Sequence, residues 1–371
     1  MTENLELLRS LCLAFGPSGC EDNVRERILE EGKKYCSDFA VDCMGNLVFR
    51  FFPEQGKKKL MISAHMDEVG FMIHSITDEG YLKFSTLGGI DERVLCGRCV
   101  TVGNETRRVS GVIASKAIHH QSAEERKKSM SVKEMLIDIG VATAEEAERL
   151  VQIGDFGTFD SEFYLFGDEK SPLIKSKALD DRLGCAVMLL IMKKIALGEI
   201  RPSMEIDFCF TVREELGLSG AKVVAEGLAP DYAIILETTA VADIADTDKA
   251  LRVADIRSGG VISLLDRSTI YDSNFVRFAL DVAEKNKIPA QVKRFVSGGN
   301  DAGHIHKSGK GVKCLAISAP TRYLHSPACV TAVMIRPGIA PIYVLLWPRI
   351  SASSFTPPRD ILTYFLFTAF A

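Results

Sequence analysis

The chain has 371 residues, a length that is typical of two domains and sufficient to bury a large hydrophobic core. Hydrophobic residues make up 47% and charged residues 25%, which argues against disorder, a collagen-like repeat and a disulfide-stabilised miniprotein. The net charge of -4 gives no electrostatic reason to expect nucleic acid as a partner. We also expect no membrane span, because no uninterrupted apolar stretch reaches ~18 residues. The N-terminus lacks a secretory signal pattern, and the ten scattered cysteines favour reduced thiols in a cytoplasmic protein.

The first part of the chain predicts two helices, a hairpin and a buried strand. Apolar residues at helical spacing predict helices over 5–15 and 21–35, separated by a Gly-Pro-Ser-Gly break. Residues 41–52 predict a hairpin that turns at Gly45-Asn46. The short apolar run 59–64 is suited to a buried strand, and it ends on His65.

Residues 70–165 have a different character and predict a small inserted β-rich module. Short alternating stretches such as FMIHSI, YLKFSTL and RRVSGVIAS are separated by Gly, Asn and Asp. Within this module, 119–129 predicts a polar mobile loop that includes His119-His120, 132–140 predicts a helix, and 143–154 predicts a capped helix.

From residue 173 onward, strands and helices alternate. Helices are expected over 178–197, 219–228 and 273–287, and strands over 204–211, 232–236, 260–265, 291–296 and 312–317. This alternation predicts an α/β fold with a sheet covered by helices. The simplest organisation is a catalytic domain of 1–69 and 166–333 interrupted by the module 70–165. The tail 334–371, rich in proline and without amphipathic period, does not fit this fold.

Acidic residues and histidines follow several predicted strands, at the sheet edge where α/β proteins bind ligands. His65 and Asp67 alternate on an extended segment, so an imidazole ligand and its carboxylate partner can point the same way. A strand-end histidine beside a solvated aspartate is the simpler alternative. Asp180 and Asp181 begin an apolar helix, where capping is the usual role and cation bridging the alternative.

A second set of acidic residues follows the later strands. Glu214-Glu215 ends an apolar strand before a glycine-rich turn, so one carboxylate can bind a metal while the other acts as a base. Glu237 and His325 follow further strands; together these side chains suit two divalent cations such as Zn²⁺, Co²⁺ or Mn²⁺. The GGNDAG segment suits close approach of a substrate, with helix capping by Asp301 as the alternative.

Six motifs in this order give the sequence a specific resemblance. AHMDEVGFMI, KALDDRLGCAV, REELGLSGA, LDRSTIYD, GGNDAG and YLHSP resemble the glutamyl-aminopeptidase family of co-catalytic metallopeptidases, which includes tetrahedral aminopeptidases and relatives labelled cellulase or endoglucanase. The resemblance runs from about residue 5 to about residue 333. Family members usually continue with an acidic stretch and a closing amphipathic helix, so the different tail 334–371 suggests a shifted reading frame near Val333. The resemblance implies a zinc-aminopeptidase-like mixed sheet flanked by helices, with an inserted β-barrel-like domain that assembles dimers into a dodecamer.

The resemblance also implies a role for each candidate residue. His65, Asp180 and Glu237 would bind one metal, and Asp180, Glu215 and His325 the other, which gives two divalent ions per subunit. Glu214 would be the general base, and Asp67 would orient His65. Gly298, Gly299, Asn300 and Asp301 would line the substrate site, and Asn300 replaces the threonine that is more common in the family.

The implied activity is removal of N-terminal residues from short peptides. Three alternatives remain at this point: a deacylase of small N-acyl substrates with the same metals, a glycosidase, and an inactive assembly protein. A glycosidase needs two carboxylates around a sugar ring and usually no metal, so the two predicted histidine ligands disfavour it.

Overall fold

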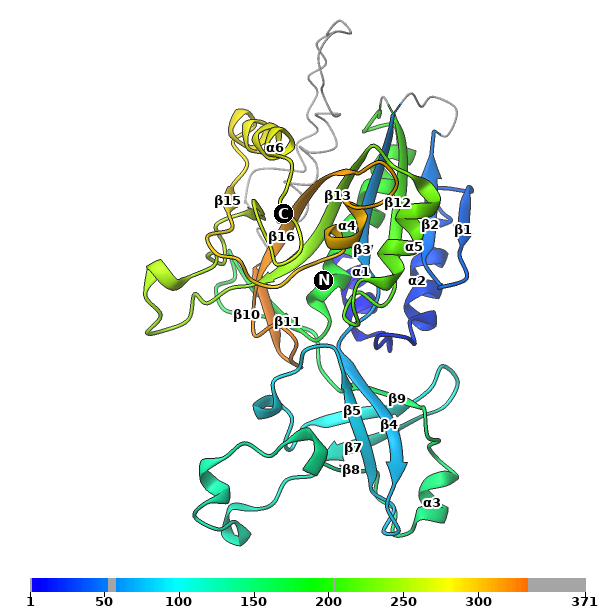
Figure 1. Ribbon diagram of the computed structural model, residues 1–371, viewed down its shortest axis with the longest axis vertical. Helices are drawn as coiled ribbons and strands as arrows, with labels where there is room; N and C mark the ends of the chain where they lie inside the picture. Colours follow the sequence, from blue (N-terminus) through cyan, green and yellow to red (C-terminus); the bar gives the residue numbers. More distant parts are fainter. Residues whose placement is uncertain (1, 53–57, 203, 333–371) are drawn as a thin grey trace, which may run out of the picture.

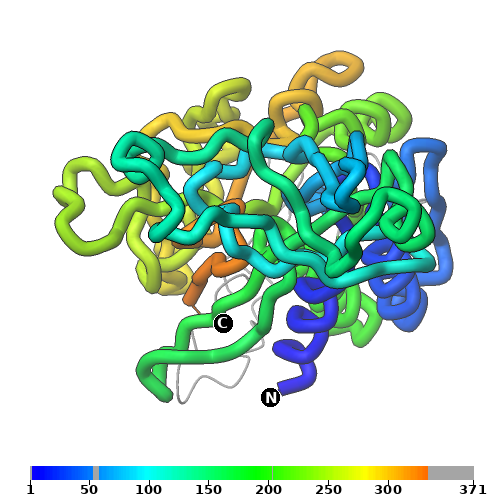
Figure 2. Tube along the Cα trace, turned by 90° about the horizontal axis from the view of Figure 1, so that it is seen from below, coloured from blue at the N-terminus to red at the C-terminus, as the bar shows by residue number. Residues whose placement is uncertain are grey.

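The computed structural model describes residues 2–52, 58–202 and 204–332. They form an α/β part built on an eleven-stranded mixed sheet and, below it in Figure 1, a closed six-stranded barrel. Seen from below, the barrel lies across one end of the α/β part (Figure 2). Within the described ranges, no helix has the length and apolar character needed to cross a membrane. The atypical tail 334–371 lies outside the described residues.

The sheet has the order β1-β2-β12-β3-β13-β16-β17-β11-β10, with β14 and β15 branching from β16. Strands β12, β3, β13 and β16 are parallel to one another. The strands span β1 Phe39–Val41, β2 Leu47–Phe51, β3 Lys59–His65, β10 Tyr164–Phe166, β11 Leu173–Ser176, β12 Glu205–Thr211, β13 Tyr232–Ala240, β14 Gly260–Ile262, β15 Ala290–Val292, β16 Lys313–Arg322 and β17 Cys329–Ala332.

Helices cover both faces of this sheet. Consecutive residues of β3 and β12 are buried, and since side chains alternate between faces, both faces must be covered. Helix α4 packs on β3 and β13 with α1 and α2 beside it, whereas α5 and α7 contact each other and the strands β12, β13 and β16. The helices span α1 Glu3–Leu13, α2 Asp22–Gly32, α3 Ala144–Glu148, α4 Leu179–Ala196, α5 Ser219–Leu228, α6 Ser273–Lys285 and α7 Ala302–Ile305.

The barrel closes in the order β4-β5-β8-β7-β6-β9. Its core holds Phe71 edge-on to Phe84 and Phe159, with ring centroids 5.1 and 5.3 Å apart. Closure pairs each of its strands on both sides, which protects the strand edges. The strands span β4 Gly70–Ile76, β5 Leu82–Leu87, β6 Cys99–Gly103, β7 Arg108–Ile113, β8 Ile137–Asp138 and β9 Phe156–Phe159.

The helix predicted over 132–140 is wrong. Residues Val132–Glu134 form a single 3₁₀ turn, and the chain then enters strand β8, where Ile137 pairs with Leu82 and Ile113. The apolar residues of this short segment fit either period, and pairing between β5 and β7 decides for the strand. The capped helix predicted next is confirmed but shorter: Thr143 caps α3, and the helix ends at Glu148.

Candidate active site

The predicted metal ligands gather at one edge of the sheet. His65 is the last residue of β3, and Thr211, its register partner, ends β12 just before Glu214-Glu215. Glu237 lies on the neighbouring strand β13. Asp180 lies in the first turn of α4, where its backbone and that of Asp181 are non-helical, unlike the regular helix that follows. Parallel strands thus deliver residues distant in sequence to one place.

Each oxygen of the Asp180 carboxylate faces a different histidine. Oδ1 lies 3.1 Å from His65 Nε2, and Oδ2 lies 3.3 Å from His325 Nε2. Glu237 Oε1 is 3.6 Å from His65 Nε2, and Glu215 Oε1 is 3.2 Å from His325 Nε2. The structure therefore brings all five predicted ligands together, with Asp180 between two groups.

Both histidines are oriented through their other ring nitrogen. His65 Nδ1 is 3.1 Å from the main-chain oxygen of Asp67 and 3.4 Å from its carboxylate. His325 Nδ1 is 2.8 Å from the carbonyl oxygen of Gly89, which follows strand β5 of the barrel. A proton on each Nδ1 leaves Nε2 free to ligate a cation. Nothing in the sequence pointed to Gly89, because this contact spans 236 residues.

Asp67 also fixes the acidic pair at the end of β12. Its carboxylate accepts hydrogen bonds from the backbone amides of Glu214, at 3.0 Å, and Glu215, at 3.1 Å. Asp67 is fully buried, and its contacts join the segment after β3 to the segment after β12. The carboxylates of Glu214 and Glu215 are thus carried on a backbone held by hydrogen bonds.

The carboxylates of this cluster create a strong negative potential. Burial, with the nearby Asp180, raises the pKa of Glu237 to about 8. Burial also raises the pKa of Glu214 well above its ordinary value; His65 opposes this shift, while Glu237 and Glu215 add to it. Burial alone would lower the pKa of His325, but contacts with Asp180 and Glu215 raise it to about 12. Uncompensated buried carboxylates are costly, so this cluster is suited to cations.

Two groups of donor atoms, each within 4.8 Å of one another, occur among the described residues. One contains His65, Asp180 and Glu215, and the other contains His65, Asp181 and Glu237. Imidazole nitrogen and carboxylate oxygen in such groups fit divalent zinc, cobalt or manganese. Asp181 is an additional candidate: its Oδ1 accepts from the Gly184 amide, and its Oδ2 has no hydrogen-bond partner in the described part of the chain.

The GGNDAG segment lies beside the cluster; Gly298 and Gly299 are exposed, Gly303 is buried, and the two polar side chains form hydrogen bonds. Asn300 donates to the Tyr271 hydroxyl at 3.0 Å and accepts from the Ala302 amide. Asp301 accepts from Thr211 at 2.6 Å and Ser63 at 3.3 Å, which ties it to the ends of β12 and β3. The backbone at Gly298 and Gly299 is exposed and can be reached by a substrate. Contact of this segment with substrate stays a prediction.

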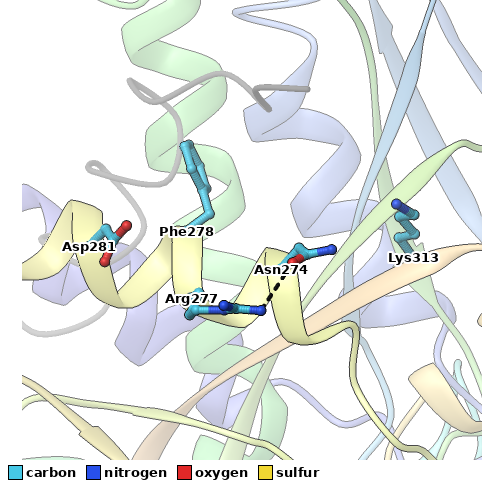
Figure 3. A pocket seen from close by; sticks show the side chains of 5 residues that line it. All are labelled: Asn274, Arg277, Phe278, Asp281 and Lys313. Carbon is cyan, nitrogen blue, oxygen red and sulfur yellow. Dashed lines mark hydrogen bonds between the residues drawn. The ribbon is translucent and has the colours of Figure 1, made fainter. Parts of the chain in front are cut away.

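The structure has a pocket beside the cluster and another away from it. A small pocket beside the cluster is lined by Asp180, Glu215 and His325, with Glu68 and Lys177 among its other walls. A larger pocket lies on the outer face of α6 and contains none of the predicted site residues (Figure 3). There, Arg277 donates to Asn274 at 3.2 Å (Figure 3).

A sheet edge that gathers two imidazoles around a shared carboxylate is the arrangement of a metal-dependent hydrolase. The profile of the M42 glutamyl aminopeptidase family matches residues 45–334, and the chain therefore belongs to this family. Its members are metallopeptidases, so the chain is a metallo-aminopeptidase, as the sequence motifs predict.

Individual relatives agree with this assignment. A protein of Acetivibrio thermocellus that carries an aminopeptidase name is 37% identical over 325 residues, which cover 87% of this chain and 92% of the relative. A TET aminopeptidase from a marine sediment archaeon of the Thaumarchaeota has a TM-score of 0.85 and 34% identity over 89% of this chain and 91% of its own. The TET1 peptidase of Pyrococcus horikoshii, which can assemble into a tetrahedron or a large octahedral shell, has a TM-score of 0.77 and 34% identity, covering 89% and 94%.

Proposed function

We propose that the chain is a dinuclear aminopeptidase that removes N-terminal residues from short peptides. The observation that carries this proposal is the position of Asp180, whose two oxygens face two different histidines at 3.1 and 3.3 Å. His65, Asp180 and Glu237 would hold one divalent cation, and Asp180, Glu215 and His325 the other. Zn²⁺ and Co²⁺ suit this mixture of nitrogen and oxygen donors best, followed by Mn²⁺.

Two bound cations supply Lewis acidity to the scissile carbonyl and lower the pKa of water. The remaining steps belong to the chain. Glu214 would be the general base: burial raises its pKa, which makes its carboxylate a stronger base, and it would take a proton from water and deliver it to the leaving amine. Asp67 holds the backbone of Glu214 and the ring of His65 in fixed relation. The exposed backbone at Gly298 and Gly299 would contact the bound peptide.

The barrel is the proposed assembly domain. It is inserted between β3 and β10, so it can present a surface to another subunit without interrupting the sheet edge that carries the site. By analogy with the solved TET1 structures, which include a dodecamer and a tetrahedron, we propose dimers that build a dodecamer. A cytoplasmic location is supported by ten cysteines that are all free thiols.

The test is a panel of aminoacyl chromogenic substrates assayed before and after chelation and after return of Zn²⁺ or Co²⁺. We expect hydrolysis of free-amine substrates that chelation abolishes and metal restores, with no cleavage of N-acylated or glycoside analogues. Cleavage of an N-acyl bond in preference to free-amine substrates would instead support the deacylase, and undiminished activity in metal-free protein would contradict the mechanism.

A further inference from the structure

Three charged side chains are buried beside the proposed ligands without belonging to them. Lys177 Nζ lies 2.7 and 2.9 Å from the two carboxylate oxygens of Glu68, and an Arg182 guanidinium nitrogen lies 3.5 Å from the same carboxylate. The side chains of Lys177, Glu68 and Arg182 are 5%, 3% and 0% exposed. We call Glu68, Lys177 and Arg182 the charged clamp. A buried ion cluster is weak evidence of a stability device, because desolvation offsets much of its attraction.

The clamp holds the two chain segments that carry the proposed ligands. Glu68 directly follows Asp67, and Lys177 and Arg182 stand on either side of Asp180 in the sequence. Glu68 and Lys177 also line the small pocket that is lined by Asp180, Glu215 and His325. The clamp therefore fixes the segment after β3 against the segment that enters α4.

Arg182 and Glu68 of the clamp also form hydrogen bonds with the end of α1 and the loop that follows it. Arg182 donates to the carbonyl oxygens of Leu11, at 2.7 Å, and Gly16, at 3.0 Å. The Glu68 amide also donates to the Gly16 carbonyl at 3.0 Å. A Cβ at Gly16 would lie 2.5 Å from Val24 Cγ2 and 2.7 Å from the Arg182 guanidinium, so a larger residue would force these groups to move. The backbone of residues 11–16 thus helps to fix the position of the clamp.

The barrel reaches the clamp through one hydroxyl. Thr158 of β9 donates to Glu68 at 2.8 Å and lies 3.1 Å from Lys177 Nζ, from which it accepts. Thr158 is buried, and β9 pairs with β4 and β6 inside the barrel. The hydrogen bonds of Thr158 therefore connect the barrel to Glu68 and Lys177, which lie beside the proposed metal site.

We propose that the charged clamp is a positioning device, which sets the spacing of His65 and Asp180 and which the barrel holds through Thr158. This inference rests on the proposed dinuclear site. Glu68, Lys177, Arg182 and Thr158 are positioning residues, because none of them is among the proposed ligands or the proposed base. Their loss is expected to loosen the ligand cluster rather than remove a ligand.

The test compares Thr158→Val, which keeps the shape and removes the hydroxyl, with Thr158→Ser, which retains it. Glu68→Gln tests the clamp directly. The matched control is Glu205→Gln, which removes the partner of Lys59 at 3.2 Å, at the end of β3 remote from His65. The readouts are the Zn²⁺ dissociation constant, measured by competition with a chromogenic chelator, and kcat and KM at temperatures where each variant is folded.

We expect Glu68→Gln to weaken Zn²⁺ binding about tenfold, at the low end of losses seen for residues that orient metal ligands. Thr158→Val should weaken it several-fold and lower kcat more than it changes KM, while Thr158→Ser and Glu205→Gln stay near wild type. If Thr158→Val lowers only the melting temperature, with Zn²⁺ affinity and kcat unchanged, the clamp has no positioning role. The Thr158 variants decide this question even where Glu68→Gln fails to fold. Wild type that binds no metal would instead contradict the proposed function itself.

Discussion

Glu214 and Glu215 are adjacent carboxylates for which we propose different roles, and isosteric substitution separates them. Glu215 Oε1 lies 3.2 Å from His325 Nε2, within the second proposed ligand group. The contact that fixes Glu214 is a main-chain hydrogen bond to Asp67 at 3.0 Å, which survives any change of side chain. Glu214→Gln therefore removes basicity alone, whereas Glu215→Gln replaces a charged ligand by a neutral one.

The expected effect of Glu214→Gln is a loss of at least ~10²-fold in kcat, the lower range for general-base catalysis. Each tenfold change in rate corresponds to about 1.36 kcal/mol, so this loss is about 2.7 kcal/mol of barrier height. Metal content should match wild type. Glu215→Gln should weaken binding of one metal by ~10-fold or more, since even residues that only orient ligands contribute that much.

The assay is steady-state kinetics on an aminoacyl chromogenic substrate, combined with elemental analysis of the same preparations. Glu226→Gln, on the exposed side of α5, is the control for the substitution itself and should change neither quantity. If Glu214→Gln loses a metal while Glu215→Gln keeps both, the two roles are reversed. If neither substitution affects rate or metal content, the acidic pair is not part of the site.

Two further predictions concern stability. Burial, with the charge of Asp67, raises the pKa of Glu21 from 4.5 to about 7, so the folded state favours the protonated acid and loses stability as pH rises between these values. Glu21→Gln keeps an oxygen for the Gly19 and Arg213 amides and should gain about 3 kcal/mol above pH 7 but little below pH 4.5 in denaturant titrations. An equal gain at both pH values would contradict this origin. Phe71→Ala should cost about 3–5 kcal/mol and lower the barrel's calorimetric transition, and an unchanged transition would show that its edge-on ring contacts do not hold the barrel together.

The α/β part was largely predictable because its strands and helices have clear periods. The strand predicted over 59–64 and the helix over 178–197 correspond to β3 and α4 within one residue at each end. The strand predicted over 312–317 instead continues to Arg322, where pairing with β13 and β17 extends it. Propensity and pattern indicate where a strand forms, whereas its neighbours decide where it ends.

The candidate ligands were predictable for a related reason: acidic residues directly after apolar strands are rare without a purpose. Contacts between distant segments were not predictable. Lys177 and Glu68 are 109 residues apart, and neither lies in a periodic pattern that indicates a partner. Asp181 illustrates the same limit, since two adjacent aspartates at a helix start give no indication of which one faces a histidine.

The central claim is that Asp180 bridges two divalent cations, and metal stoichiometry in Asp180→Asn tests it most directly. Elemental analysis should give about two ions per chain in wild type, and less than one in Asp180→Asn, because a neutral amide offers one ligand oxygen where the carboxylate offers two. Aminopeptidase activity should be lost with the metals. Two tightly bound ions in Asp180→Asn, or a wild type that holds a single ion at full activity, would contradict the dinuclear site.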